Sequence, residues 1–145
     1  MNNHMLGSSS HARYGHFHYP RVVALKCPGC GQQMIATNLD CPAGYEHFWD
    51  VDPYRGLWAA VCPHCGSGKE MNWEQMKDYE LWYKLSLREE EVWAWNSGHL
   101  AFIIQKVEKK VDKAHPWAYF EAYLNKSWLV KLSQERYINK LKALL

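Results

Sequence analysis

The sequence predicts an α+β fold, in which an N-terminal β ribbon with a metal site is followed by a small helical region. Two observations favour the ribbon: a pair of matching cysteine motifs, and short β-prone runs beside them. Apolar residues at helical spacing after residue 69 favour the helices. We therefore divide the 145 residues into a flexible leader (residues 1–20), a ribbon (residues 21–68) and a helical region (residues 69–145).

The leader combines four histidines with serine and glycine, and it has no apolar segment of the kind found in signal peptides. We expect the leader to be mobile and its histidines to have no ligand role. No run of 18 apolar residues occurs in the chain, so we expect no membrane span. Cysteines in C-x-x-C pairs without a signal peptide fit a reducing compartment, and we expect a cytoplasmic protein.

The ribbon contains four runs with strand character. The run at residues 21–26 leads into the first cysteine motif, and residues 34–37 follow that motif and can pair back. Residues 45–50 and 57–61 are aromatic and apolar, and the D-P-Y-R-G sequence at residues 52–56 is typical of a turn. We therefore predict that these last two runs form a hairpin, whose second strand leads to the second motif.

The two motifs are C-P-G-C-G at residues 27–31 and C-P-H-C-G at residues 62–66, and they are called the first and second hook below. In each hook, Pro restricts φ after the first cysteine, and the final Gly can adopt a positive φ. Four thiolates would complete a closed tetrahedral metal site with no position left for water or substrate. The pattern predicts one structural Zn²⁺ held by Cys27, Cys30, Cys62 and Cys65.

Tetrahedral sulfur also suits a single iron ion, which is the alternative metal. The run at residues 58–69 resembles the second knuckle of rubredoxins, and the gap between the hooks has a similar length. The Q-Q-M-I-A sequence after the first hook departs from that family, whereas the double C-P-x-C-G pattern is shared by the general zinc-ribbon class. The resemblance implies a zinc-ribbon arrangement whose stability depends on its metal.

The fifth cysteine, Cys41, has no partner cysteine at the required spacing. It could form an alternative ligand pair with His47, or it could be a free thiol on the loop between the hooks. His64 lies inside the second hook, where side chains normally point outward, and we do not expect it to bind the metal.

Helix-start signals recur through the last half of the chain. Capping boxes begin at Asn72 and at Ser86. Pro116 suits a first helical turn, and Ser133 could cap the last helix. A long helix is predicted from the second capping box, with a possible kink at residues 97–98. Its mostly apolar face would consist of Val92, Asn96, Leu100, Ile103, Val107 and Val111.

The W-A-W-N-S-G-H-L sequence at residues 93–100 resembles a segment of small bacterial zinc-ribbon proteins in which a helix follows the ribbon and a basic helix ends the chain. That group brings no established activity with it. Asn96 and His99 are three residues apart, so on a helix both could hydrogen-bond one partner. His99 could be a general base, but no nucleophile or carboxylate pair accompanies it. We expect no enzymatic role, and we expect Trp93 or Trp95 to be buried.

Charge is distributed unevenly, although the net charge is only +2. Residues 70–91 contain seven acidic and three basic residues, whereas residues 97–145 contain nine basic and four acidic residues. Basic residues interleaved with aromatic residues near the C-terminus occur in proteins that bind single-stranded nucleic acid, and a solvated helix surface would show the same pattern. The candidate contacts are Lys126, Lys131, Arg136 and Lys140.

Taken together, these features predict a non-enzymatic, zinc-stabilised binding module that contacts nucleic acid through its basic helical end. The first alternative is a protein-interaction or assembly module, in which exposed tryptophan and leucine faces bind a partner or a second copy. The second alternative is an iron-containing electron carrier of the rubredoxin type. No membrane partner is expected.

Overall fold

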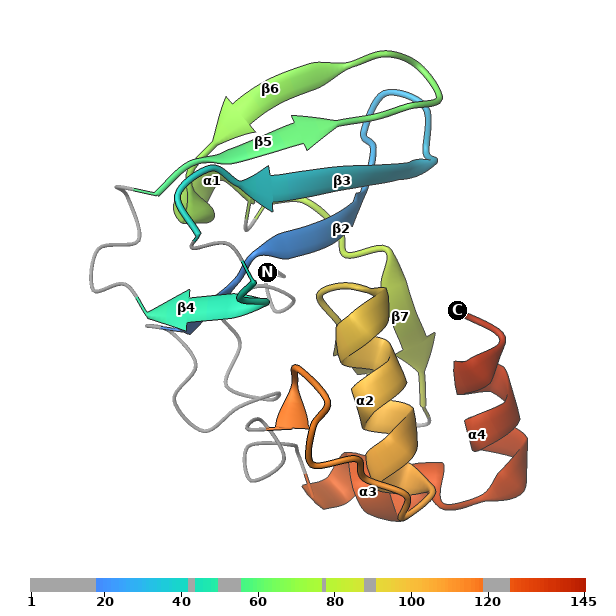
Figure 1. The fold of residues 1–145 in the computed structure, drawn as a ribbon. Coiled ribbons are helices and arrows are strands. Elements are labelled where there is room, and N and C mark those ends of the chain that lie inside the picture. Colours follow the sequence, from blue (N-terminus) through green and yellow to red (C-terminus); the bar gives the residue numbers. More distant parts are fainter. Residues whose placement is uncertain (1–17, 42–43, 50–55, 77, 88–90, 119–125) are drawn as a thin grey trace.

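The computed structural model describes residues 18–41, 44–49, 56–76, 78–87, 91–118 and 126–145 (Figure 1). Strands are concentrated in the first part of the chain and the longer helices in the last part, so the fold is α+β, as predicted. The strands form one four-stranded sheet and two sheets of two strands each. No helix among the described residues is long and apolar enough to cross a membrane.

The main sheet is antiparallel throughout. Its order is β2 (Val22–Lys26), β3 (Gln33–Asn38), β5 (Trp58–Val61) and β6 (Gly68–Met71). The register places Val23, Ala36 and Ala60 in one row, and all three are buried. Alternate residues of a strand share one face, so this row belongs to the side of the sheet that faces the core. The pairing of β2 with β3 confirms the first predicted hairpin.

A short helix, α1 (Trp73–Met76), follows β6. The Trp73 ring lies with its centroid 5.4 Å from that of Trp58 in β5, which fixes the helix to the sheet. The predicted capping box is formed: Gln75 N–H donates to Asn72 Oδ1 over 2.9 Å, and Asn72 N–H donates to Gln75 Oε1 over 2.8 Å. This reciprocal pair satisfies two backbone donors at the start of the helix.

A second, smaller sheet pairs β1 (His18–Pro20) with β4 (His47–Trp49). Residues 18–20 therefore belong to a strand, although the sequence places them in the flexible leader. The other leader residues lie outside the described part of the chain.

The predicted hairpin between residues 45–50 and 57–61 does not form. β4 pairs with β1, and β5 pairs with β3 and β6. In this position Trp58 and Ala60 of β5 join the buried face of the main sheet. The Trp58 Nε1–H group also donates to Pro20 O over 3.1 Å. Burial of these side chains favours β3 as the partner of β5. The turn-forming residues near β5 carry no information about this burial, so the sequence predicted a different partner.

A third strand pair, β7 (Tyr83–Ser86) and β8 (Glu91–Ala94), occupies the region where the long helix is predicted to begin. The helix prediction is wrong there. Residues 92–94 are all buried, which means that both faces of this segment are covered, as in an enclosed strand. The helix α2 (Ser97–Val107) begins only afterwards. Glu89 of the predicted second capping box lies outside the described residues.

Strand β2 has hydrogen-bonding neighbours on both sides. On the edge of β2 that faces away from β3, Trp82 N–H donates to Ala24 O over 2.9 Å, and Ala24 N–H donates to Trp95 O over 2.6 Å. Further along, Lys26 N–H donates to Glu80 O over 2.7 Å. A single cluster of buried side chains accordingly includes residues from the main sheet and from the segments that follow it.

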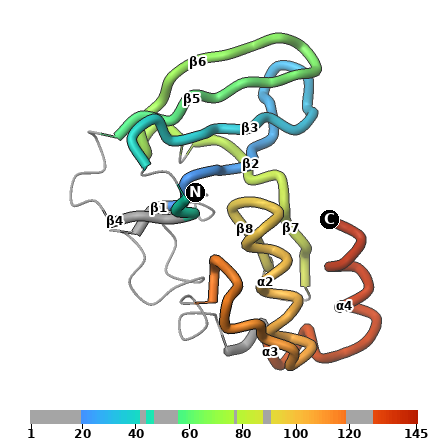
Figure 2. The backbone as a smooth tube through the Cα atoms, in the orientation of Figure 1, coloured from blue at the N-terminus to red at the C-terminus, as the bar shows by residue number. Residues whose placement is uncertain are grey.

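Three helices that contact one another are found among the described residues of the last part of the chain: α2, α3 (Lys126–Leu132) and α4 (Glu135–Lys142). Figure 2 shows these helices grouped at the opposite end of the molecule from β5 and β6. An ion pair between Lys142 and Glu108 links the end of α4 to the end of α2.

Ser133 does not cap α4, because the N-cap residue is Gln134 and forms no side-chain cap. Ser133 Oγ instead donates to Val130 O over 2.6 Å at the end of α3. Most of the helix predicted from Pro116 would fall in residues 119–125, which are outside the described residues.

Candidate metal centre

Both hooks lie at the same end of the main sheet. The first hook connects β2 to β3, and the second connects β5 to β6 (Figure 1). Since β3 pairs with β5 in an antiparallel register, the two connections leave the sheet on the same side. Two motifs that are more than thirty residues apart in the sequence are thereby brought together.

The two hooks have the same backbone hydrogen bonds. Gly31 N–H donates to Cys27 O over 2.8 Å, and Gly66 N–H donates to Cys62 O over 2.9 Å. In both hooks the backbone N–H of the first cysteine donates, over 2.8 Å, to the carbonyl oxygen of the residue that follows the glycine. The glycines have φ values of +77° and +79°, which residues with a Cβ rarely adopt. The C-P-x-C-G pattern therefore specifies one turn, used twice.

The four hook sulfurs form a compact cluster, with all sulfur–sulfur distances within 4.8 Å. Cys27 Sγ lies 3.7 Å from Cys65 Sγ, and Cys30 Sγ lies 3.5 Å from Cys62 Sγ. All four cysteines are free thiols. In a tetrahedral site with metal–sulfur bonds of ~2.3 Å, neighbouring sulfurs are separated by about 3.8 Å. The four predicted residues thus lie where they could hold a metal ion.

Each hook contributes one buried and one exposed cysteine to the cluster. Cys27 is 1% exposed and Cys62 is 0% exposed, because each directly follows a strand of the main sheet. Cys30 and Cys65 lie on the outer side of the turns and are exposed. The cluster therefore has an inner half that is anchored in the core and an outer half that faces solvent.

The two exposed thiols have very different acidities. Hydrogen bonds from the Ser67 hydroxyl and backbone, together with the Cys62 thiol, lower the pKa of Cys65 to about 6. For Cys30, a backbone hydrogen bond from Gln32 acts in the same direction, but desolvation and the neighbouring thiols raise the pKa to about 12. Closely packed thiols share protons unequally because several adjacent thiolates repel one another. A cation removes that repulsion, so metal binding must release protons and weaken as the pH falls.

The Ser67 hydroxyl has no counterpart at the corresponding position of the first hook. Its Oγ lies 3.0 Å from Cys65 Sγ. Gln32 takes the equivalent position after Cys30 and approaches that sulfur through its backbone. Sequence reasoning did not identify Ser67, because a serine after a C-x-x-C-G motif has no distinct signal of its own.

Cys41 does not belong to the cluster. Its thiol donates to Tyr45 O over 3.5 Å, and desolvation raises its pKa, although Arg21 opposes the shift. His47 lies in β4, whose side chains are outside the described part of the structure. His64 is exposed, and it is absent from the cluster, as expected.

The candidate nucleic-acid contacts lie on α3 and α4. Arg136 and Lys140 are one helical turn apart on α4, and both cations lie over the Tyr137 ring, at 4.6 Å and 5.9 Å from its centroid. Arg136 also donates to the Tyr137 hydroxyl over 3.1 Å. Lys131 is half-buried on α3. The side chain of Lys126, the first residue of α3, is outside the described part of the structure.

Asn96 and His99 have structural roles. Asn96 is the N-cap of α2: its Oδ1 accepts from His99 N–H over 2.9 Å, while its Nδ2 donates to Val22 O over 2.7 Å. His99 is 0% exposed, and its ring is stacked between those of Trp95 and Trp117, with centroids 5.0 Å and 4.6 Å away. Trp95 N–H donates to His99 Nδ1 over 3.3 Å. The expected burial of Trp93 and Trp95 is confirmed, since each is 2% exposed.

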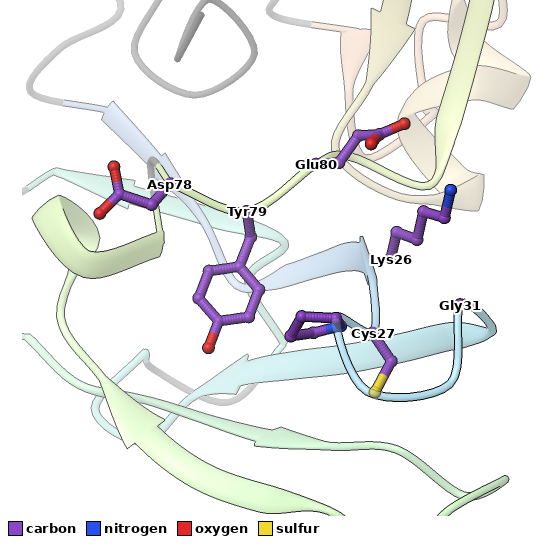
Figure 3. A pocket seen from close by; sticks show the side chains of 7 residues that line it. Lys26, Cys27, Gly31, Asp78, Tyr79 and Glu80 are labelled. Carbon is purple, nitrogen blue, oxygen red and sulfur yellow. The ribbon is translucent and has the colours of Figure 1, made fainter.

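A cavity of about 460 Å³ lies beside the first hook (Figure 3). Its lining comes from the end of β2, from the hook and from the segment before β7: Lys26, Cys27, Pro28, Gly31, Asp78, Tyr79 and Glu80. Figure 3 shows Tyr79 on one side of this space and Lys26 on the other. The sequence did not reveal this cavity, because it depends on residues 78–80 lying beside β2.

Comparison of the chain with models of protein families, with curated proteins and with solved structures finds no match. The assignment of a site therefore depends on the geometry of the described residues.

Proposed function

We propose that the chain binds one zinc ion through Cys27, Cys30, Cys62 and Cys65, and that this ion stabilises a zinc-ribbon arrangement of the two hooks and the main sheet. The observation that carries the proposal is the cluster of four free thiols, all within 4.8 Å of one another, on two turns with the same hydrogen bonds. Four sulfur ligands fill a tetrahedral shell, so the ion has a structural role.

Zinc is preferred to iron because the site must tolerate solvent at two of its four ligands. Cys30 and Cys65 are exposed, and residues 63–70 around the second hook are exposed as well. Zinc undergoes no redox change in such surroundings. The experiment is elemental analysis of protein purified anaerobically and without added metal. One equivalent of zinc per chain is expected, whereas a red protein with one iron per chain would support the electron-carrier alternative.

We propose further that the protein is a non-enzymatic binding module whose partner is single-stranded nucleic acid. Support comes from Arg136 and Lys140 on α4, two exposed cations that lie over the ring of the half-buried Tyr137. The two cations can contact phosphates, while the aromatic ring between them offers a stacking surface for a base. Lys131 of the neighbouring helix α3 adds a third positive charge to this end of the molecule.

A matched pair of triple variants tests this partner. One variant replaces Lys131, Arg136 and Lys140 with glutamine. The control replaces Lys69, Lys110 and Lys113, which are exposed elsewhere, and thereby removes the same charge. Fluorescence anisotropy with a labelled single strand should show at least tenfold weaker binding for the first variant only. The slope of log K against log salt should fall by about two units for that variant, at ~0.7 per lost phosphate contact.

The alternative is a module that binds a protein or a second copy of the chain. It is favoured by Val130 on α3, which is 72% exposed, and by the exposed Leu145 at the C-terminus. Sedimentation analysis at low and high salt distinguishes the nucleic-acid-binding module from the module that binds a protein or a second copy of the chain. Self-association that is insensitive to salt and is lost in Val130→Ser, combined with no binding of single strands, would replace nucleic acid as the proposed partner.

A further inference from the structure

We infer that the metal cluster is also an oxidation site for hydroperoxides, and that oxidation joins the two hooks through two disulfides, Cys27–Cys65 and Cys30–Cys62. This inference rests on the metal-binding function proposed above. Four cysteines allow three pairings, and the sequence alone would favour the local ones within each C-x-x-C motif. The geometry points to a different pairing.

The four sulfurs differ in their accessibility to solvent. A hydroperoxide must reach a sulfur from solvent, and only Cys30 and Cys65 are exposed. These two lie on different hooks, so each hook presents one sulfur for attack. Cys27 and Cys62 are buried at the ends of β2 and β5 and can react only with a neighbouring sulfur.

Each exposed sulfur lies close to a sulfur of the other hook. Two sulfur–sulfur contacts between the hooks each join an exposed sulfur of one hook to the buried sulfur of the other hook. Cys30 Sγ lies 3.5 Å from Cys62 Sγ, and Cys65 Sγ lies 3.7 Å from Cys27 Sγ. These contacts use each cysteine once, so both disulfides can form in the same molecule. A sulfur that is oxidised at the surface thus has a resolving thiol beside it on the other hook.

The chemistry balances with one hydroperoxide per disulfide. The exposed thiolate attacks the O–O bond, which forms a sulfenic acid and, after protonation, an alcohol, or water when the oxidant is hydrogen peroxide. The buried thiolate then attacks the sulfenic sulfur; the S–S bond forms, and the hydroxide that leaves is protonated to water. Two thiolates lose two electrons, and the hydroperoxide gains them. Two turnovers consume all four thiolates, so none remains to hold the metal.

The consequence for the fold depends on the pairing. Disulfides between the hooks would tie the β2–β3 connection to the β5–β6 connection, as the metal does. They would close loops of more than thirty residues, whereas local disulfides would close loops of four and leave the hooks unlinked. With the proposed pairing, the oxidised chain keeps the end of its main sheet together after the metal is released.

The experiment uses the full chain, first analysed for bound zinc and then treated with hydrogen peroxide in the presence of a chromophoric zinc chelator. Peptide mapping by mass spectrometry, without reduction, identifies the disulfides. We expect one equivalent of zinc to be released as two disulfides form, and a far-ultraviolet circular dichroism spectrum close to that of the untreated protein. Cys41→Ser is the control and should behave in the same way, because Cys41 is outside the cluster.

Local disulfides Cys27–Cys30 and Cys62–Cys65 as the main products would overturn the inference, and so would sulfinic or sulfonic acid at Cys30 and Cys65.

Two double variants give a second test. Cys30→Ser/Cys62→Ser retains the proposed pair Cys27 and Cys65, and Cys27→Ser/Cys62→Ser retains Cys30 and Cys65. Peroxide should oxidise the first to a disulfide at least tenfold faster, and equal rates would count against the pairing. Absence of metal before peroxide treatment would contradict the proposed zinc-binding function. The disulfide pairing would still be tested in that case, because peptide mapping does not depend on bound metal.

Discussion

The end of the main sheet that carries the candidate metal site, called the metal end, and the aromatic joint near α2 both bring together segments that are distant in the sequence, but by different means. The metal end consists of the two hooks; the aromatic joint consists of Trp95, Asn96, His99 and Trp117. The second half of the metal end is exposed from residue 63 to residue 70, so it has little core of its own. All four residues of the aromatic joint are buried.

The two regions differ in what stabilises them. A small exposed β unit cannot bury enough apolar surface to be stable alone, and a structural metal can supply the missing free energy. The aromatic joint depends on close packing of large rings and on the hydrogen bond from Asn96, the N-cap of α2, to Val22 O in β2. With a metal bound as proposed, the chain has two separately stabilised ends, which should respond to different perturbations.

The largest effect is expected at the metal end. Cys62→Ser removes a buried ligand, and the apparent free energy of zinc binding in small zinc domains is about 10–16 kcal/mol. We expect loss of stoichiometric zinc and a fall in Tm of more than about 10 °C, measured by elemental analysis and calorimetry. Cys41→Ser is the matched control and should keep the zinc and the Tm. A Cys62→Ser protein with unchanged Tm would show that the metal is not needed for the fold.

A somewhat smaller effect is expected at the aromatic joint. Trp95→Ala removes a ring that is stacked on His99 and lies 5.8 Å from the Trp117 ring, and such truncations cost about 3–5 kcal/mol. The free energy of unfolding, measured with denaturant, should fall by this amount, while the folded protein still binds one zinc ion. Tyr45→Ala, at an exposed aromatic residue, should change stability little. Loss of zinc from folded Trp95→Ala protein would break the comparison, because the two ends would then depend on each other.

Substitution of the helix cap should have a third, moderate effect. Asn96→Ala removes both the acceptor for His99 N–H and the donor to Val22 O, and we expect a loss of about 1–3 kcal/mol. Asn96→Ser keeps a side-chain acceptor for the cap and loses the donor to Val22 O, so its cost should be lower. Denaturant titration of both variants measures separately how much the cap hydrogen bond and the hydrogen bond to Val22 O contribute to the free energy of unfolding. Equal losses would show that the bond to β2, and not the cap, provides the stability.

The smallest effect is expected from the ion pair between α2 and α4. The hydrogen bond from Lys142 lowers the pKa of Glu108, and the carboxylate form is therefore favoured in the folded state. The stabilisation is present at neutral pH and is lost as the pH falls through the lowered pKa of Glu108. An NMR titration of its carboxyl carbon should give a midpoint below the ordinary glutamate value, and Lys142→Gln should return the midpoint to that value. Zinc release on acidification should be unchanged by Lys142→Gln.

Local sequence was a good guide to the turns. The hooks, the capping box at Asn72 and the first hairpin were all predicted, because each depends on residues only a few positions apart. The four thiols were also correctly expected to lie together. Where two segments compete for a partner, local signals failed. β5 pairs with β3 and not with residues 45–50, and residues 91–94 form a strand where a helical stripe was read.

Residues within each hook specify its conformation, since proline, cysteine spacing and a glycine with positive φ require only their own neighbours. Contacts between distant segments set the hydrogen bonds of residues 80–82 and 95–96 to β2 and the position of His99 between two tryptophan rings. The physical reason is that burial and backbone pairing between distant segments depend on the whole core. The spacing of apolar residues is compatible with a helix or an enclosed strand until that core is formed.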